Sequence, residues 1–320
     1  YSMSRDPKIT RRVFFKKSLR TGLAVGAAAA IPGSFGRVWA ESQVQEGAQG
    51  PEVIVSKGDP VEATKAAVEA LGGMSRFVRP GDRVAIKPNF SFSNAPERAT
   101  STNPEVVKTV AQLCVEAGAK RVLVLDHTIH NPKICVDRTG IKTALKGMDK
   151  VALLPLNQRR FYREVAVPEG KELNKVEISK AVLDADCMIS VPVAKSHSAT
   201  EVSFSIKGLL GVVWDRSFFH RSVELNQALA DLSTVVQSDL ILVDAIRALQ
   251  TNGPGGPGRV AELGTIVASR DPVAADAYAV GLTQWDNQTL TGRRIKHLLA
   301  AYEMGLGEIE VGKMRVREVG

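Results

Sequence analysis

The stretch that decides the fold runs from Asn103 to Asp126, NPEVVKTVAQLCVEAGAKRVLVLD. Asn103 followed by Pro104 is typical of a helix start, because Asn caps free N–H groups and proline suits the first helical turn. Apolar side chains then recur at helical spacing as far as Gly118, which ends the helix. The continuous apolar run 122–125 indicates a strand that is buried on both faces of a sheet. The stretch therefore predicts one helix–strand unit of an α/β protein.

Strand and helix patterns alternate on both sides of this unit. The fold class that we predict is α/β, with a mostly parallel or mixed sheet flanked by helices. Segment 149–180 has no clean periodicity, and we interpret it as a small β-rich insertion. Further strands are predicted at 53–55, 83–87, 188–193, 240–243 and 265–268, and further helices at 59–72, 225–236, 272–282 and 294–304.

The N-terminal segment resembles a twin-arginine export signal. Arg11 and Arg12 precede Phe14 and Lys16, an apolar run follows at 19–31, and small residues near Ala40 suit cleavage. We therefore divide the chain into a signal peptide (1–40), a linker (41–50) and an α/β domain (51–320). This interpretation predicts a periplasmic or other extracytoplasmic location and the twin-arginine export machinery as a partner. The alternative is a retained amphipathic anchor.

The excess of positive charge belongs to this N-terminal segment. The chain has 42 basic and 34 acidic residues, of which residues 1–40 hold eight basic residues and one acidic residue. The remainder is nearly neutral, and aromatic residues make up only 5% of the chain, so we expect no nucleic-acid partner. Three scattered cysteines, at 114, 135 and 187, are too few for the four thiolates of an internal iron–sulfur cluster. The sequence does not decide whether Cys135 forms a disulfide.

Polar and ionisable side chains follow four of the predicted strands. In an open α/β sheet, ligands bind beyond the carboxyl ends of the strands, so these side chains are candidates for one shared site. They are, in chain order, Lys87 and Asn89; Asp126, His127 and His130; Lys195, Ser196 and His197; and Asp244.

Several roles are open to these residues. Ammonium, amide and backbone N–H groups suit a small anionic substrate or cofactor, and imidazole and Lys195 suit proton transfer. Imidazole with carboxylate also suits a divalent metal, while the plain alternative is that each histidine only joins loops. The candidate sets are Lys87, Asn89, Lys207, Asn252 and Gly255 for binding, His197, His220 and Lys195 for catalysis, and Asp126, His197, His220 and Asp244 for a metal.

Taken together, these motifs resemble the DUF362 family of α/β proteins over roughly residues 53–311. The resemblance implies an α/β architecture and a site within the shared motifs, but no substrate. Many relatives carry ferredoxin-like four-cysteine motifs, so redox chemistry in this chain would need a separate redox partner protein. The motifs that carry the resemblance are Lys87-Pro88-Asn89, Thr102-Asn103-Pro104-Glu105, Leu183-Asp184-Ala185-Asp186, Lys195-Ser196-His197, Ser205-Ile206-Lys207-Gly208-Leu209, His220, Asp244-Ala245-Ile246, Asn252-Gly253-Pro254-Gly255-Gly256 and Asp271-Pro272-Val273-Ala274-Ala275-Asp276.

Two functions from different classes follow from the sequence. The first is an exported enzyme of unassigned reaction, with a Lys/His/Asp site that binds an anionic substrate or cofactor. The sequence leaves open whether its reaction depends on a metal or is linked to redox chemistry. The alternative is a non-catalytic protein that binds a cofactor or a metal for assembly elsewhere. A bound species that is recovered unchanged favours the second function.

Overall fold

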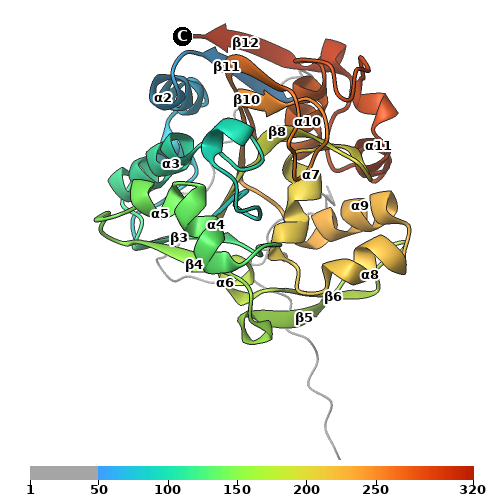
Figure 1. Cartoon of the computed structure of the whole chain (residues 1–320), viewed down its shortest axis with the longest axis horizontal. Coiled ribbons are helices and arrows are strands. Elements are labelled where there is room, and N and C mark those ends of the chain that lie inside the picture. Colours follow the sequence, from blue (N-terminus) through green and yellow to red (C-terminus); the bar gives the residue numbers. More distant parts are fainter. Residues whose placement is uncertain (1–49) are drawn as a thin grey trace, which may run out of the picture.

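The computed structural model of this protein describes residues 50–320, so the predicted signal peptide and all but the last residue of the predicted linker lie outside the described residues. A ten-stranded sheet forms the centre of the molecule, with helices on both faces (Figure 1). Its strands are β1 (Glu52–Lys57), β2 (Arg83–Pro88), β3 (Arg121–Asp126), β4 (Val151–Pro155), β7 (Cys187–Val191), β8 (Val193–His197), β9 (Glu201–Ser203), β10 (Leu240–Leu249), β11 (Val260–Ser269) and β12 (Arg315–Val319).

The sheet is mixed, as predicted. Its order is β12-β1-β11-β10-β7-β2-β3-β4, and β8 pairs with β10 and β9 off this path. Strand β11 runs antiparallel to both of its neighbours, whereas every other pair along the main order is parallel. The carboxyl ends of β2, β3, β7 and β10 therefore meet at one edge of the sheet.

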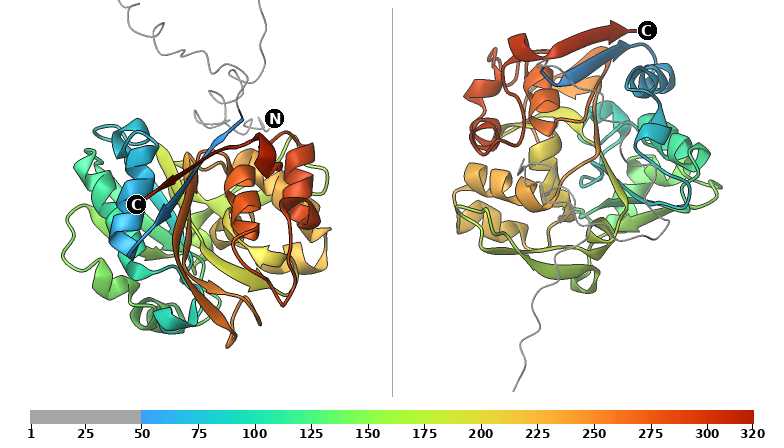
Figure 2. Two further views of the ribbon diagram at one scale, coloured as in Figure 1. Left: turned by 90° about the horizontal axis from the view of Figure 1, so that it is seen from above. Right: turned by 180° about the vertical axis from the view of Figure 1, so that it is seen from behind.

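Two layers of helices bury the two faces of the sheet (Figure 2). Alternate residues of one strand face opposite layers: Ile54 packs with α2 and α3, whereas Val53 and Val55 pack with α7, α9, α10 and α11. The helices are α2 (Pro60–Ala70), α3 (Pro104–Glu116), α4 (Pro132–Arg138), α5 (Ile141–Ala144), α6 (Lys180–Leu183), α7 (Ser205–Gly208), α8 (Arg216–Arg221), α9 (Leu225–Val235), α10 (Pro272–Val280) and α11 (Lys296–Glu303).

Three of the helices predicted from the sequence begin at an acidic or amide side chain that precedes a proline, as α4 also does at Asn131. Asp59 accepts from the backbone N–H groups of Val61 and Glu62, at 2.8 and 3.2 Å. Asn103 caps α3 and Asp271 caps α10 in the same way. Because such caps satisfy N–H groups that have no partner in the helix, these starts could be located from the sequence alone.

Two parts of the predicted order differ from the structure. The strand predicted at 188–193 is divided into β7 and β8 at Pro192, which has no N–H to continue the ladder. The predicted β-rich insertion at 149–180 is confirmed in part. Its first strand, β4, joins the main sheet, and β5 (Tyr162–Ala166) pairs with β6 (Lys175–Ser179) in a separate two-stranded sheet.

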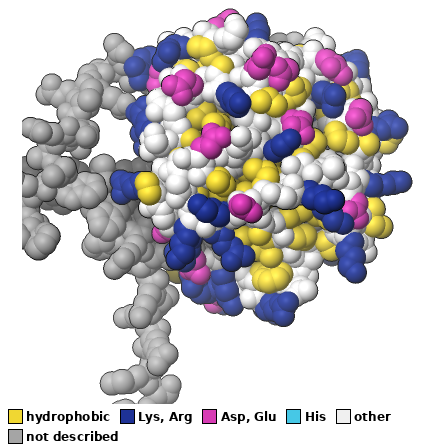
Figure 3. All heavy atoms as spheres, turned by 90° about the vertical axis from the view of Figure 1, so that its left-hand side faces the viewer, with side chains coloured by type: hydrophobic (Ala, Val, Ile, Leu, Met, Phe, Trp, Pro, Cys, Tyr) yellow, Lys and Arg dark blue, Asp and Glu magenta, His cyan; other side chains and the backbone are white. Residues whose placement is uncertain are grey.

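One face of the molecule mixes charges of both signs (Figure 3), and the three cysteines are buried. On the face in Figure 3, acidic and basic side chains are interspersed with apolar ones. Cys114, Cys135 and Cys187 are buried free thiols. Cys135 therefore forms no disulfide within residues 50–320, a point that the sequence left undecided. No helix in that range combines the length and apolarity needed to cross a membrane.

Candidate functional site

A buried ion pair stands at the carboxyl ends of β2 and β3. Lys87 Nζ lies 3.2 Å from Asp126 Oδ1, and the two side chains are 2% and 0% exposed. Lys87 also donates to the carbonyl of Pro88, at 2.6 Å. The other carboxylate oxygen accepts from Phe90 N and Ser91 Oγ, both at 2.9 Å. Burial lowers the pKa of Lys87, and the carboxylate of Asp126 opposes that shift.

A second buried lysine lies in β8. Lys195 Nζ donates to the carbonyl of Thr100 at 2.7 Å and to that of Pro254 at 3.4 Å, and it lies 4.9 Å from the centre of the Phe92 ring. Burial, and then the charge of Lys207, lowers the pKa of Lys195 to about 7. The sequence placed this residue directly after a predicted strand, and it lies within a strand of its own, β8, where it joins two loops that border the site.

The third lysine, Lys207 in α7, has a different environment. Its side chain is only half-buried, and within residues 50–320 its ammonium has no hydrogen bond and no ion pair. Burial, followed by the charges of Arg216 and Lys87, lowers the pKa of Lys207 to about 7. Lys207 is therefore the lysine of this group whose donors are available to a ligand.

Arg216 completes the cationic group, and no sequence motif predicted a role for it. Its guanidinium donates to the carbonyls of His127 (2.8 Å) and Thr128 (3.1 Å), which fixes α8 over the end of β3. Burial lowers its pKa, and the charge of Asp126 opposes this. The cationic group, which we define as Lys87, Lys195, Lys207 and Arg216, thus has Asp126 as the carboxylate whose charge acts on all four members.

Three histidines lie close enough to Lys207 for its charge to lower their pKa values. His197 is buried, and burial followed by Lys207 and Lys195 lowers its pKa to about 2. His220 is largely exposed, and partial desolvation of its ring, followed by the charges of Lys207 and Arg216, lowers its pKa. His297 in α11 is fully buried, and burial with Lys207 lowers its pKa to about 3. All three rings are therefore neutral at pH 7.

The hydrogen bonds of these rings differ. His197 Nδ1 accepts from Ala199 N at 3.1 Å, so the proton of the neutral ring is on Nε2. His297 has no partner for either ring nitrogen within the described part of the chain. No pattern in the sequence singled out His297, because it lies alone on a short helix far along the chain. His297 is recognised only by its buried ring nitrogens without partners, a feature that can be seen in the structure but not in the sequence.

His127 and His130, which follow β3, have structural roles. His127 Nδ1 donates to the carbonyl of Val213 at 3.0 Å, and the ring stacks on Trp214 with 5.4 Å between centres. His130 Nδ1 accepts from Ser93 Oγ at 2.9 Å, which joins its loop to the loop after β2.

Four other predicted residues mainly bond to or pack against the loops around the site. Asn89 Oδ1 accepts a hydrogen bond from Val193 N at 2.9 Å, beside Pro192, which has no N–H group to donate. Asp244 accepts from Asn103 N (2.6 Å) and Ile246 N (3.1 Å), and burial raises its pKa to about 6. In the glycine-rich loop, Asn252 donates to the carbonyl of Pro257, and a side chain on Gly255 would press on Phe92.

The charge balance favours an anion over a metal ion. Among residues 50–320, no three His, Cys, Asp or Glu side chains are grouped so that they could hold a metal. Of the predicted metal set, Asp126 is paired with Lys87 and Asp244 is bonded to backbone N–H groups. Like charges repel strongly where water is excluded, so the cationic group would oppose a divalent cation.

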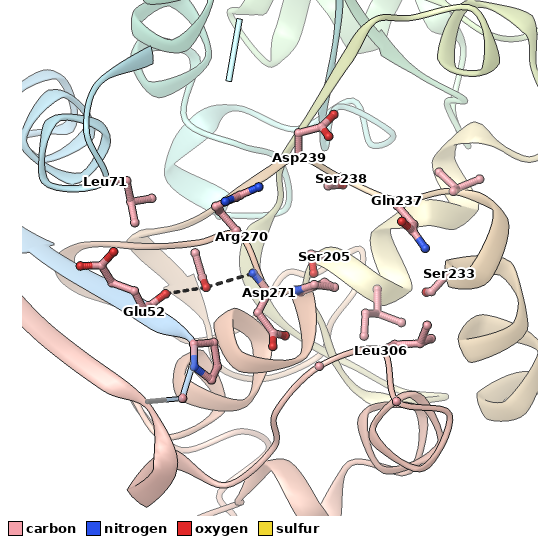
Figure 4. Close-up of a pocket in the computed structure, with 18 of the residues that line it drawn as sticks. Glu52, Leu71, Ser205, Ser233, Gln237, Ser238, Asp239, Arg270, Asp271 and Leu306 are labelled. Carbon is pink, nitrogen blue, oxygen red and sulfur yellow. Dashed lines mark hydrogen bonds between the residues drawn. The ribbon is translucent and has the colours of Figure 1, made fainter. Parts of the chain in front are cut away.

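A separate cavity of about 670 Å³ opens at the opposite edge of the sheet, beside the amino ends of β1 and β10 (Figure 4). Ser205 and Ile206 of α7 line it, together with Arg270 and Asp271. None of the site residues predicted from the sequence lines this cavity. The short helix α7 therefore stands between the cavity and the cationic group.

Among solved structures, the chain resembles the lactate racemase apoprotein of Thermoanaerobacterium thermosaccharolyticum. The TM-score is 0.46 at 13% identity, and the match covers 72% of this chain and 57% of that chain.

Comparison with known sequences places the chain in a family. It is 31% identical over 242 residues to a thylakoid-associated protein of Synechocystis, a match that covers 73% of each chain. It is also 28% identical over 115 residues to the ribose-phosphate pyrophosphokinase of Bacillus caldolyticus, which covers 35% of each chain. Residues 84–281 match the family model described as a domain of unknown function, DUF362. That span holds the cationic group and most of the sheet, and the chain belongs to the DUF362 family.

Proposed function

We propose that this protein is an enzyme that binds a small anionic substrate or cofactor at the cationic group. The observation that carries the proposal is Lys207, a half-buried ammonium without a described partner that lies among other cations. A ligand carboxylate or phosphate would supply the negative charge that Asp126 alone does not provide. Charge-assisted hydrogen bonds of this kind contribute about 1.5–3 kcal/mol each.

The catalytic part of the proposal rests on the neutral histidines. With its proton on Nε2 and cations beside it, His197 would act as a neutral hydrogen-bond donor to developing negative charge, rather than as an acid–base group. His220, exposed and neutral at pH 7, would be the proton acceptor. This division of roles refines the proton-transfer role that the sequence predicted for both rings.

Calorimetric titration with inorganic phosphate, sulfate and propionate tests the binding site. We expect Lys207→Met to weaken binding of the preferred anion by roughly 10- to 100-fold, because one charge-assisted contact is lost. The matched control is Lys175→Met, since Lys175 is an exposed lysine paired with Glu164. Equal affinities for the wild type and a folded Lys207→Met variant would overturn the proposal.

We also propose that the protein is exported by the twin-arginine route, on the basis of Arg11 and Arg12. The change of both residues to Lys keeps the charge but removes the guanidinium pair. We expect it to retain the protein in the cytoplasm, and cell fractionation measures this. Unchanged export of the double variant would contradict the proposal.

A further inference from the structure

We propose that Lys207 is a nucleophile that forms an imine with the carbonyl carbon of a 2-oxo acid. This inference rests on the proposed anion site, and it specifies both the chemical class of the ligand and a covalent step. It concerns one nitrogen atom, so it can fail while the anion site stands.

The contacts of the three lysines single out Lys207. Lys87 is paired with Asp126 and donates to the carbonyl of Pro88. Lys195 donates to two carbonyls and lies on the face of Phe92. Lys207 has no such partner within residues 50–320, and it is the one member of the trio whose side chain is partly exposed. A nucleophile needs both a free lone pair and access for its substrate, and only Lys207 has this combination.

The surroundings of Lys207 suit an amine that reacts. A lysine becomes nucleophilic when burial and a neighbouring cation favour its uncharged form. Arg216 and Lys87 supply those neighbouring charges, and they lower the pKa of Lys207 to about 7. At pH 8 most of this amine is therefore uncharged, while exposed lysines, with an ordinary pKa near 10.4, remain protonated.

The same cations select the substrate. A 2-oxo acid carries a carboxylate next to its reactive carbonyl, so the positive charges of Arg216 and Lys87 would attract the carboxylate while Lys207 reaches the adjacent carbon. A carbonyl compound without the carboxylate would lack that attraction.

The proposed step balances without an oxidant or a reductant. The lone pair of Lys207 Nζ attacks the carbonyl carbon, a C–N bond forms, and the carbonyl oxygen takes up a proton. His220 carries the proton lost by the nitrogen to that oxygen. The C–O bond then breaks while His220 carries the remaining proton of the nitrogen to the departing hydroxyl, and water leaves, which gives a neutral imine.

Borohydride trapping tests the step on the full chain. The protein is incubated with pyruvate at pH 8, reduced with sodium borohydride, digested and mapped by mass spectrometry. Propionate, which has the carboxylate but no oxo group, is the matched ligand control. We expect one reduced pyruvate adduct, on Lys207, and none with propionate. Absence of the adduct from Lys207, or equal labelling of exposed lysines such as Lys175, would overturn the inference.

Lys207→Arg separates this inference from the proposed function. Arginine keeps the positive charge but has no nucleophilic amine, so the variant should lose the adduct and keep its affinity for sulfate within about threefold. If the wild type forms no adduct but binds sulfate, and Lys207→Met does not bind it, the anion site stands and the imine does not. The adduct is mapped on the wild-type chain, so the test holds even if a variant fails to fold.

Discussion

Lys195 and Lys207 both have a pKa of about 7, and this value would set the pH range in which the proposed site attracts anions. Below pH 7 both amines are protonated, and above it they lose charge. If an anion binds only the charged lysines, these must take up protons from solution when it binds. This weakens the binding free energy by about 1.4 kcal/mol for each pH unit and each lysine. The proposed site would therefore bind anions best in neutral to mildly acidic solution.

The first prediction is that the affinity for sulfate falls as pH rises from 7 to 9. The charge of sulfate is constant over this range, so the change reports the protein. We expect a decrease of roughly tenfold per pH unit if one lysine must be reprotonated. Calorimetry in buffers of different ionisation enthalpy measures the accompanying proton uptake. An affinity that is constant from pH 7 to 9 would contradict the pKa values of these lysines.

The second prediction concerns Gly211, whose missing side chain leaves room for the buried ion pair. A methyl group at this position would overlap Asp126 Oδ1 and Lys87 Cε. We expect Gly211→Ala to reduce the free energy of unfolding by about 1–3 kcal/mol, as overpacking does, and to weaken anion binding. The matched control is Gly208→Ala in α7, where an added methyl group meets no atom within 4 Å. Similar losses of stability and affinity in both variants would show that the space beside the Lys87–Asp126 ion pair is not what Gly211 provides.

At the scale of the element, α7 is a short helix whose position depends on a distant carboxylate. Asp276 in α10 is fully buried, and its two oxygens accept from Ser205 N and Ile206 N, both at 3.0 Å. Burial raises the pKa of Asp276 to about 7. The start of α7, and with it Lys207, is therefore fixed by a residue about 70 positions later in the chain.

The third prediction follows from this anchor. Asp276→Ala leaves two buried N–H groups without partners, and each costs about 1–3 kcal/mol. We expect denaturant unfolding to show a loss of that order and calorimetry to show weaker binding of sulfate. Asp276→Asn keeps one acceptor oxygen and should lose less in both measurements. An Ala variant with normal stability and affinity would show that α7 does not depend on Asp276.

The elements themselves could largely be predicted from the sequence, because their signals are local. A capping side chain before a proline and a continuous apolar run are read within a few residues, as at Asn103 and 122–125. The uses of Asn89 and Asp244 could not be read in this way. Their partners, Val193 N and Asn103 N, lie 104 and 141 residues away. The sequence thus indicated the edge of the sheet where polar groups collect, but not which of them bond to the backbone.

At the scale of the whole molecule, the sheet is completed by segments from both ends of the described chain. Strand β1 lies between β11 and β12, and its register pairs Val53 with Ser269 on one side and Val316 on the other. The apolar side chains of β1 are buried in both helical layers. Loss of β12 therefore uncovers the edge of a strand that belongs to the core.

The fourth prediction is that a chain ending at Met314 is destabilised by about 3–5 kcal/mol and aggregates more readily. It loses the five-residue ladder of β12, and the exposed edge of β1 becomes available to other chains. Denaturant unfolding and light scattering measure the two effects. Arg317→Ala, which removes an ion pair with Glu52 and a hydrogen bond to the carbonyl of Ala70, should change stability by no more than about 1 kcal/mol. A truncated chain as stable as the full one would contradict the role of β12.

The position of β1 in the sheet also determines how late in synthesis this strand can pair. Lys57 ends the strand, and its first partner begins at Val260, so the ribosome must add about 200 residues before β1 can pair. At common synthesis rates this takes roughly 10–40 s. During that interval the apolar residues Val53, Ile54 and Val55 have no sheet to join. They are the segment of the described chain that a ribosome-associated chaperone would have to shield for longest.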